Sequence, residues 1–200
     1  MIRLIAVCLI ISLISGKTFS QQNPPVKIVP EFSLTKPEIE LYKLINAYRK
    51  EKGLPTVKLS TSLCYVARTH ARDQEANFKQ GTSCNMHSWS QNTTWSSCCY
   101  TPDHKQGKCM WDKPRELTNY TGDGFEISFW STYQDPDPVK QAKDILDGWK
   151  GSQGHNDVIT NRNTWKNVEW KAIGIGIYGE YADVWFGEVD DSAGTPKSGE

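Results

Sequence analysis

Several motifs of common metal and hydrolytic enzymes are missing from this 200-residue sequence. It contains no Cys-x-x-Cys pair, which argues against a structural zinc ribbon. It also contains no His-Glu-x-x-His and no Gly-x-Ser-x-Gly motif. The familiar helical zinc protease and the nucleophile-elbow hydrolase are therefore excluded, and no sequence context marks a cysteine as a nucleophile.

The sequence also lacks an excess of charge of either sign. Lysine and arginine together number 23, as do aspartate and glutamate. The first 20 residues hold two of the basic residues and no acidic one, so the remainder has 23 − 2 = 21 basic against 23 acidic residues, a net charge of −2. Nothing in this balance attracts nucleic acid or an anionic membrane.

The long apolar run is at the N-terminus, where Leu4 to Ile14 follow Arg3. This run is too short and wrongly flanked for a membrane span. A basic residue, an apolar stretch and then small and polar residues are typical of a secretory signal peptide, which we place at 1–20. The sequence therefore predicts an exported protein, secreted or periplasmic, without a membrane span.

Five cysteines remain after residue 20: Cys64, Cys84, Cys98, Cys99 and Cys109. In an oxidising compartment, four cysteines between 84 and 109 predict two disulfides that staple a long loop. A bridge between the adjacent Cys98 and Cys99 would be strained, so these two are expected to take different partners. The odd number leaves one thiol over, and the spacing leaves the connectivity open.

The hydrophobic pattern predicts one domain between a linker at 21–34 and a flexible tail at 191–200. Thr35 and Glu38 form a capping box at the start of the first helix, and Gly53 stops it. The expected elements are helices over 35–52, 60–78 and 137–150, and a hairpin of strands 172–178 and 182–189. Residues 79–121 have almost no periodicity and are expected to form one long irregular segment.

His155 is the first candidate site residue. It comes after Trp149, Gly151 and Gly154, so we expect it on a glycine-rich turn just past the end of a helix. Glu126 stands in an otherwise apolar run, where a buried carboxylate requires partners. His70 lies on the apolar stripe of the second helix, which favours a hydrogen-bonded core histidine over a ligand. His104, between Asp103 and Lys105, is interpreted as a solvated turn residue.

In combination these stretches resemble the CAP superfamily of cysteine-rich secretory, antigen 5 and pathogenesis-related 1 proteins, in particular its bacterial branch with an SCP domain. The resemblance runs from about 35 to 190. The matching stretches are Asn46 to Pro55, Ala67 to Ala71, His87-Ser88, Gly124 to Ile127, Trp149 to His155, Ile173 to Gly176 and Trp185-Phe186.

The resemblance implies an α+β fold, an α-β-α sandwich with a small antiparallel sheet between helices. It also implies a cleft in which two histidines and two acids hold a divalent metal such as zinc. The corresponding residues are His87, His155 and Glu126, whereas Ser152 stands at the position of the second acid. We therefore expect weak zinc binding, with Ser152 and His70 as supporting residues; a purely hydrogen-bonded polar cluster remains the alternative.

Two functions follow from these observations. The first is a secreted, non-catalytic module that binds a small ligand, a lipid or a glycan, or a protein. The irregular segment supplies aromatic platforms in Trp89, Trp95 and Trp111. The second is a metal-dependent extracellular hydrolase of the peptidase kind, which rests on the His/Glu cluster alone. A redox function of Cys98-Cys99 is disfavoured because vicinal cysteines lack the helix-terminus geometry that activates a thiol.

Overall fold

The computed structural model describes residues 26–198, so the predicted signal peptide and the first part of the predicted linker lie outside the described residues. The elements in chain order are β1 (Ser33–Leu34), α1 (Lys36–Glu51), β2 (Lys58–Leu59), α2 (Thr61–Asn77), α3 (Gly107–Trp111), α4 (Lys113–Leu117), β3 (Phe125–Trp130), α5 (Pro138–Gly151), α6 (Gln153–Ile159), the 3-10 helix η1 (Asn163–Trp165), β4 (Ala172–Tyr178), β5 (Tyr181–Gly187) and β6 (Lys197–Ser198). The three predicted long helices and the hairpin are confirmed within two residues at each end. In this described part of the chain, no helix is long and apolar enough to cross a membrane.

The helices begin where the sequence places capping residues. The Glu38 carboxylate accepts the Thr35 N–H at 2.7 Å at the start of α1. The Ser60 hydroxyl accepts the Leu63 N–H at 3.0 Å at the start of α2, and Asp137 caps α5 in the same way. At the end of α1, Gly53 has φ +75°, a left-handed conformation that glycine adopts without strain.

The central sheet has four strands in the order β2-β4-β5-β3. The β4–β5 pair is antiparallel, as predicted. Strand β3 also pairs with β5 in antiparallel, whereas the two-residue strand β2 pairs with β4 in parallel. The apolar run around Glu126 becomes edge strand β3. Its register places Glu126 beside Trp185 and Ser128 beside Asp183.

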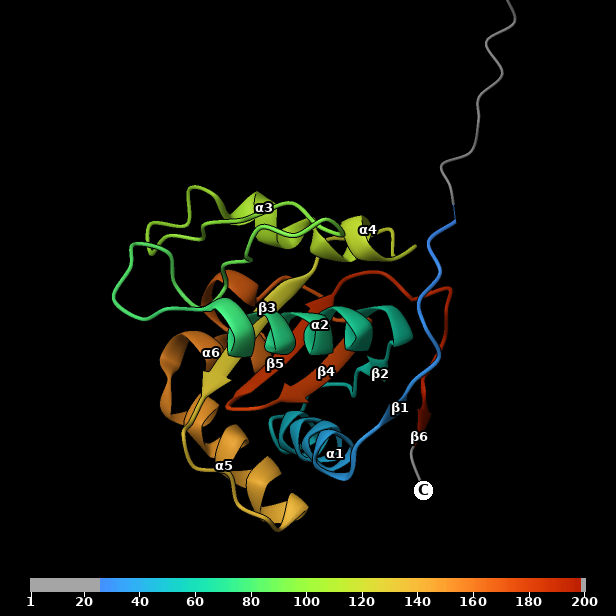
Figure 1. Ribbon diagram of the computed structural model, residues 1–200. Coiled ribbons are helices and arrows are strands. Elements are labelled where there is room, and N and C mark those ends of the chain that lie inside the picture. The colour runs from blue at the N-terminus through green and yellow to red at the C-terminus, as the bar shows by residue number, and fades with distance from the viewer. Residues whose placement is uncertain (1–25, 199–200) are drawn as a thin grey trace, which may run out of the picture.

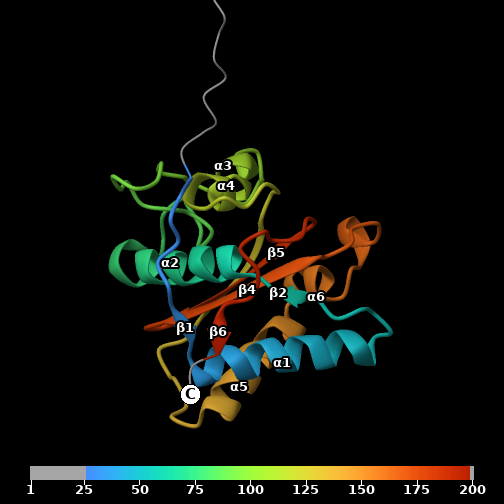
Figure 2. The same ribbon diagram turned by 90° about the vertical axis from the view of Figure 1, so that its right-hand side faces the viewer.

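The helices cover both faces of this sheet, which confirms the α-β-α sandwich. Figures 1 and 2 show α2 on one face and α1 with α5 on the other, with α3 and α4 beyond α2. The close approach of α2 depends on two glycines of β4. A Cβ at Gly174 would overlap the backbone of Leu63, and one at Gly176 would overlap the backbone of Arg68.

Each face has its own apolar core. The α1 and α5 side packs residues such as Leu41, Leu146 and Trp149 against Ile173 and Val184 of the sheet. The α2 side packs residues of α2 and the long segment 79–121 against the other face of the sheet; its buried members are Leu63, Val66, Ala67, Trp89, Cys98, Tyr100, Met110, Leu117, Tyr120, Ala172 and Trp185. The long segment therefore forms part of the core.

Segment 79–121 is less irregular than predicted, because it contains the two short helices α3 and α4. Two disulfides staple it, Cys84–Cys99 and Cys98–Cys109, which confirms both the number of bridges and the separate partners of the adjacent cysteines. Cys64 is the remaining thiol and is buried in α2. Because this segment lacks the apolar periodicity of a long helix, disulfides and buried apolar side chains hold it against the rest of the domain.

Residues 191–198, which belong to the predicted flexible tail, make hydrogen bonds to the rest of the domain. The Asp191 carboxylate accepts hydrogen bonds from the hydroxyl of Ser60 at 2.7 Å and from the N–H of Ser62 at 2.8 Å. Further along, β6 pairs with β1, which also incorporates the end of the predicted linker. These polar backbone pairings carry no hydrophobic period, and for that reason the sequence pattern does not reveal them.

Candidate functional site

Three elements place the predicted site residues around one cavity. His87 lies in the segment after α2, Glu126 in β3 and His155 in the first turn of α6. All three line a cavity of about 510 Å³. Its remaining wall is largely aromatic and apolar, formed by Tyr100, Met110, Trp111, Phe125, Ile127, Val158 and Trp165 together with His104, Gly154 and Thr164.

Glu126 is the central charge of the site. Its side chain is fully buried, and both carboxylate oxygens are engaged. Oε1 lies 2.5 Å from Nδ1 of His70, and Oε2 lies 2.9 Å from Nδ1 of His87. Burial alone would raise the pKa of Glu126, but the two imidazoles hold that pKa well below its usual range. The lone carboxylate has the partners that its apolar surroundings require.

His70 is more closely involved in the site than a core histidine need be. Its Nε2 faces the Ser88 carbonyl at 2.9 Å, an acceptor only, while Nδ1 faces the Glu126 carboxylate. Both nitrogens therefore act as donors, which describes an imidazolium. Burial lowers the pKa of His70, but the Glu126 and Asp183 carboxylates and the Ser88 carbonyl raise it to about 9. His70 thus anchors Glu126 and has no nitrogen left for a metal.

Asp183 was missed by the sequence analysis. This β5 residue is fully buried, with its Oδ2 3.7 Å from Nδ1 of His70, and burial beside Glu126 raises its pKa well above the ordinary value. Within residues 26–198, His70, Glu126 and Asp183 are the one group of three whose ligand-type atoms lie within 4.8 Å of one another, the spacing of a metal site. The signal that identified Glu126, a single acid in an apolar run, applies equally to Asp183.

The surroundings of His155 differ from the predicted glycine turn. Ser152 has an extended backbone that separates α5 from α6, so His155 begins a second helix. Gly151 and Gly154 are not among the glycines of positive φ in the described chain. Ser152 occupies the N-cap position of α6 without a side-chain capping hydrogen bond, and it is not one of the residues that line the cavity. The predicted helix break is confirmed, but Ser152 rather than a glycine makes it.

His155 remains a neutral imidazole at physiological pH. Burial, and then the charge of His87, lower its pKa to about 4, although Glu126 acts in the opposite direction. A neutral imidazole is the form that binds a metal. His155 therefore needs no deprotonation near pH 7 to accept a cation or to hydrogen-bond a ligand.

His104 is exposed, as predicted, yet it also lies at the edge of this cavity. Its Nδ1 lies 2.8 Å from the Tyr100 hydroxyl, and the Tyr100 ring packs edge-on against the His87 ring at 5.3 Å. The backbone of His104 has φ +57°, an uncommon conformation for a residue with a Cβ. The three rings form a continuous wall of the cavity.

The donor set fits a divalent metal only in part. Because Glu126 binds Nδ1 of His87, Nε2 is the nitrogen of His87 that remains for a cation, in the carboxylate–histidine–metal arrangement. His155 supplies a second, neutral imidazole. Ser152 contributes no carboxylate, so water would have to complete the coordination. The residues suit a weak zinc site with Glu126 behind it.

Comparisons with solved structures agree with this fold. An outer surface protein of Borrelia burgdorferi matches 80% of this chain and 98% of its own, with 16% identity and a TM-score of 0.50. An extracellular SCP-domain protein of Bacillus anthracis matches 76% of this chain with 16% identity and a TM-score of 0.50. A cysteine-rich secretory protein of Staphylococcus aureus covers the same share with 18% identity and a TM-score of 0.47.

This chain spans 40% of the matched Bacillus chain and 38% of the matched Staphylococcus chain. At these identities, the likeness to the Borrelia and Bacillus proteins establishes the fold alone. A comparison with curated protein sequences finds no match. The model of the cysteine-rich secretory protein family, CAP, matches residues 42–186, and this range contains His87, Glu126 and His155 together with most of the described fold. This chain belongs to the cysteine-rich secretory protein (CAP) family.

Proposed function

We propose that this protein is a secreted, non-catalytic CAP domain whose cleft binds a small ligand, a lipid or a glycan, and holds a divalent metal weakly. The cavity carries this proposal, because it combines a polar end with an aromatic wall. Its volume of about 510 Å³ is that of a site for a small organic ligand. Secretion is supported by the N-terminal signal pattern and the two disulfides.

The polar end orients the ligand. His87 presents one ring nitrogen to Glu126, and its other nitrogen is available to a metal or a ligand oxygen. His155 is neutral and accepts or donates a hydrogen bond. Trp111, Phe125 and Trp165 supply apolar area for the rest of the ligand.

The alternative function, a metal-dependent hydrolase, is less well supported by this geometry. Such an enzyme needs a general base that takes a proton from metal-bound water. Glu126 is the carboxylate of the cleft that could serve as this base, but His70 and His87 engage both of its oxygens. Its lowered pKa also makes it a poor base. We therefore propose binding as the function of the cleft.

Zinc titration calorimetry on the chain from residue 21 tests the metal part of the proposal. We expect weak binding in the wild type, and a loss of at least about tenfold in affinity in His155→Ala and in His87→Ala. The control is His104→Asn, because asparagine tolerates a positive φ and His104 is not in the proposed donor set. This control should bind zinc as the wild type does.

Restoring the missing acid provides the opposite test. Ser152→Glu places a carboxylate at the position of the second acid and should tighten zinc binding by about tenfold. Equal zinc affinity in wild type, His155→Ala and His87→Ala would show that zinc does not bind in the cleft.

A dye-displacement experiment tests ligand binding without zinc. Candidate ligands should displace an apolar fluorescent dye from the cavity, and the measurement is made in wild type and in His155→Ala.

A further inference from the structure

Exposed aromatic side chains gather at the turn of the β4–β5 hairpin, away from the His87–Glu126–His155 cleft. Trp130 at the end of β3 is 38% exposed, Tyr133 in the following loop 65% and Tyr178 at the end of β4 46%. Half of the six large exposed hydrophobic side chains in residues 26–198 thus lie in one region. Single exposed apolar residues are normal, whereas a group of them marks an interaction site.

The register of the strands places two of these rings, Trp130 and Tyr178, on the same face of the sheet. Trp130 and Tyr178 both pair with Tyr181, so the three side chains are neighbours on one face of the sheet. Helix α2 covers that face only as far as Phe78, whose ring packs edge-on against Tyr181 at 6.4 Å. Of these three side chains, Tyr181 is buried, whereas Trp130 and Tyr178 remain exposed.

The exposed rings are held in place. The Trp130 indole N–H donates to Glu180 at 2.9 Å, and the Arg72 guanidinium lies 5.2 Å from the centre of the Tyr178 ring. The Tyr133 hydroxyl donates to Asp135 at 3.2 Å. Rings that are fixed before binding lose little conformational entropy when a ligand arrives.

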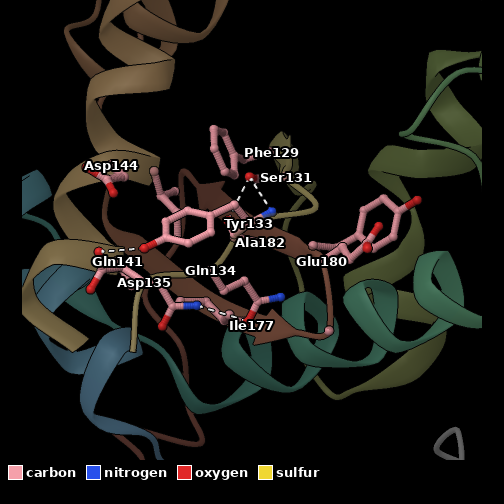
Figure 3. Close-up of a pocket in the computed structure, with 13 residues that line it drawn as sticks. Phe129, Ser131, Tyr133, Gln134, Asp135, Gln141, Asp144, Ile177, Glu180 and Ala182 are labelled. Carbon is pink, nitrogen blue, oxygen red and sulfur yellow. Dashed lines mark hydrogen bonds between the residues drawn. The ribbon is translucent and has the colours of Figure 1, made fainter. Parts of the chain in front are cut away.

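A small pocket of about 80 Å³, lined in part by Tyr133 and Glu180, lies at the same end of the hairpin (Figure 3), and its floor is on the opposite face of the sheet from Trp130 and Tyr178. Phe129, Ile177 and Ala182 give it an apolar floor, and Tyr133 lies over it. Its rim is polar and consists of Ser131, Gln134, Asp135, Gln141, Asp144 and Glu180. A ligand here would meet aromatic faces and hydrogen-bonding groups together.

The rim combines charged and uncharged polar groups. Lys140 lies 2.7 Å from Asp135 and 3.0 Å from Asp144, so its single positive charge offsets one of the three carboxylates of the rim. Gln141 donates to Gln134 at 3.3 Å, which leaves the amide nitrogen of Gln134 and the amide oxygen of Gln141 without a bond inside the described chain. Sugar hydroxyl groups match these amides and carboxylates, because a hydroxyl both donates and accepts hydrogen bonds.

We propose that this hairpin end, formed by Trp130, Tyr133, Tyr178 and the adjoining pocket, is a second binding surface and takes a neutral oligosaccharide. Sugar rings present C–H groups that pack on aromatic faces and hydroxyls that bond to amides and carboxylates. One sugar stacks on Tyr133, the most exposed of the rings, and its hydroxyls reach Gln134 and Gln141. The surface is independent of the metal and of the cleft.

The test uses the ¹⁵N-labelled chain from residue 21 and follows the indole N–H signal of Trp130, assigned with Trp130→Phe. The probes are cellohexaose, maltohexaose and chitohexaose, each added up to about 10 mM, a range that detects millimolar affinity. At least one sugar should shift the Trp130 signal in a saturable way. Tyr133→Ala should weaken binding by about tenfold, while Tyr133→Phe, which keeps the ring, should stay within about twofold.

His155→Ala separates this proposal from the function of the cleft, because it should leave sugar binding at the hairpin unchanged. The proposal is overturned if none of the three sugars shifts the Trp130 signal. It is also overturned if the shifts appear around His87 and disappear in His155→Ala, since the sugar would then occupy the cleft. Saturable binding of hexalysine at Trp130 in place of the sugars would assign the surface to a cationic peptide.

Discussion

At the scale of single residues, the site depends on how four ionisable side chains share charge. His70 is an imidazolium between Glu126 and the Ser88 carbonyl, and burial beside Glu126 raises the pKa of Asp183 well above its ordinary value. The imidazolium thus offsets the charge of Glu126 in a buried space that holds two carboxyl groups. This arrangement sets the ring of His87, because Glu126 binds its Nδ1. His70 and Asp183 therefore support the cleft without lining it.

The His70–Glu126 pair should make stability depend on alkaline pH. The pKa of His70 is raised from 6.5 to about 9, so its contribution to stability is full below about pH 6.5 and is lost as the pH rises through about 9. A shift of this size corresponds to about 3 kcal/mol. Urea unfolding of wild type and His70→Gln between pH 6 and 10 should show the decline in the wild type alone.

NMR titration of the four histidines gives an independent measurement of the same charges. His70 should lose its proton near pH 9, whereas His155 should gain one only near pH 4. His104→Asn is the control, since it removes an exposed imidazole and should leave both titrations in place. Titration of His70 near pH 6.5 would contradict the ion pair.

At the scale of elements, the C-terminal segment completes helix α2. Asp191 accepts hydrogen bonds from Ser60 and Ser62, which satisfies donors in the first turn of α2. A carboxylate there also interacts favourably with the N-terminal end of the helix dipole. The residues after β5 thus stabilise the helix that carries His70.

Asp191→Ala should therefore lower the free energy of unfolding by about 1–2 kcal/mol, because the first turn of α2 loses its carboxylate partner. Asp190→Ala is a matched control one residue away. Asp190 pairs with Lys58 at 3.2 Å on the exposed surface, where such a pair is worth about 0–1 kcal/mol. Equal losses in the two variants, measured by urea unfolding, would show that Asp191 has no special role.

At the scale of the whole molecule, the disulfide-linked segment closes the cleft and one face of the core. The Cys84–Cys99 disulfide joins the segment just before His87 to the segment that carries Tyr100. Beside this disulfide, the Asn85 N–H donates to the Tyr100 carbonyl at 2.8 Å. His87 and Tyr100 both line the cavity. The crosslinks therefore support the site as well as the fold.

Removing Cys84–Cys99 by a double serine substitution should lower the free energy of unfolding by about 2–4 kcal/mol. Zinc affinity should fall as well, because the segment that carries His87 loses its crosslink.

The number of reactive thiols tests the disulfide map. Cys64 is buried and burial raises its pKa to about 12, so a thiol reagent should find no thiol in the native chain from residue 21 and one in urea. Two or more reactive thiols in the native protein would contradict this disulfide map.

The sequence by itself determined the elements that rest on local chemistry. Capping residues and apolar periods predicted α1, α2, α5 and the hairpin, because both act within a few residues of chain. Clustered cysteines predicted two disulfides, and a lone acid in an apolar run predicted that Glu126 has partners.

Only the tertiary structure decided what depends on contacts between distant residues. The pairing of the cysteines, the inclusion of Asp183 with His70 and Glu126, and the docking of residues 191–198 all join segments far apart in the chain. The protonation of His70 follows from Ser88 on one side and Glu126 on the other, which no local pattern brings together. Charge in a buried site is set by neighbours in space, and a sequence specifies those neighbours only through the fold.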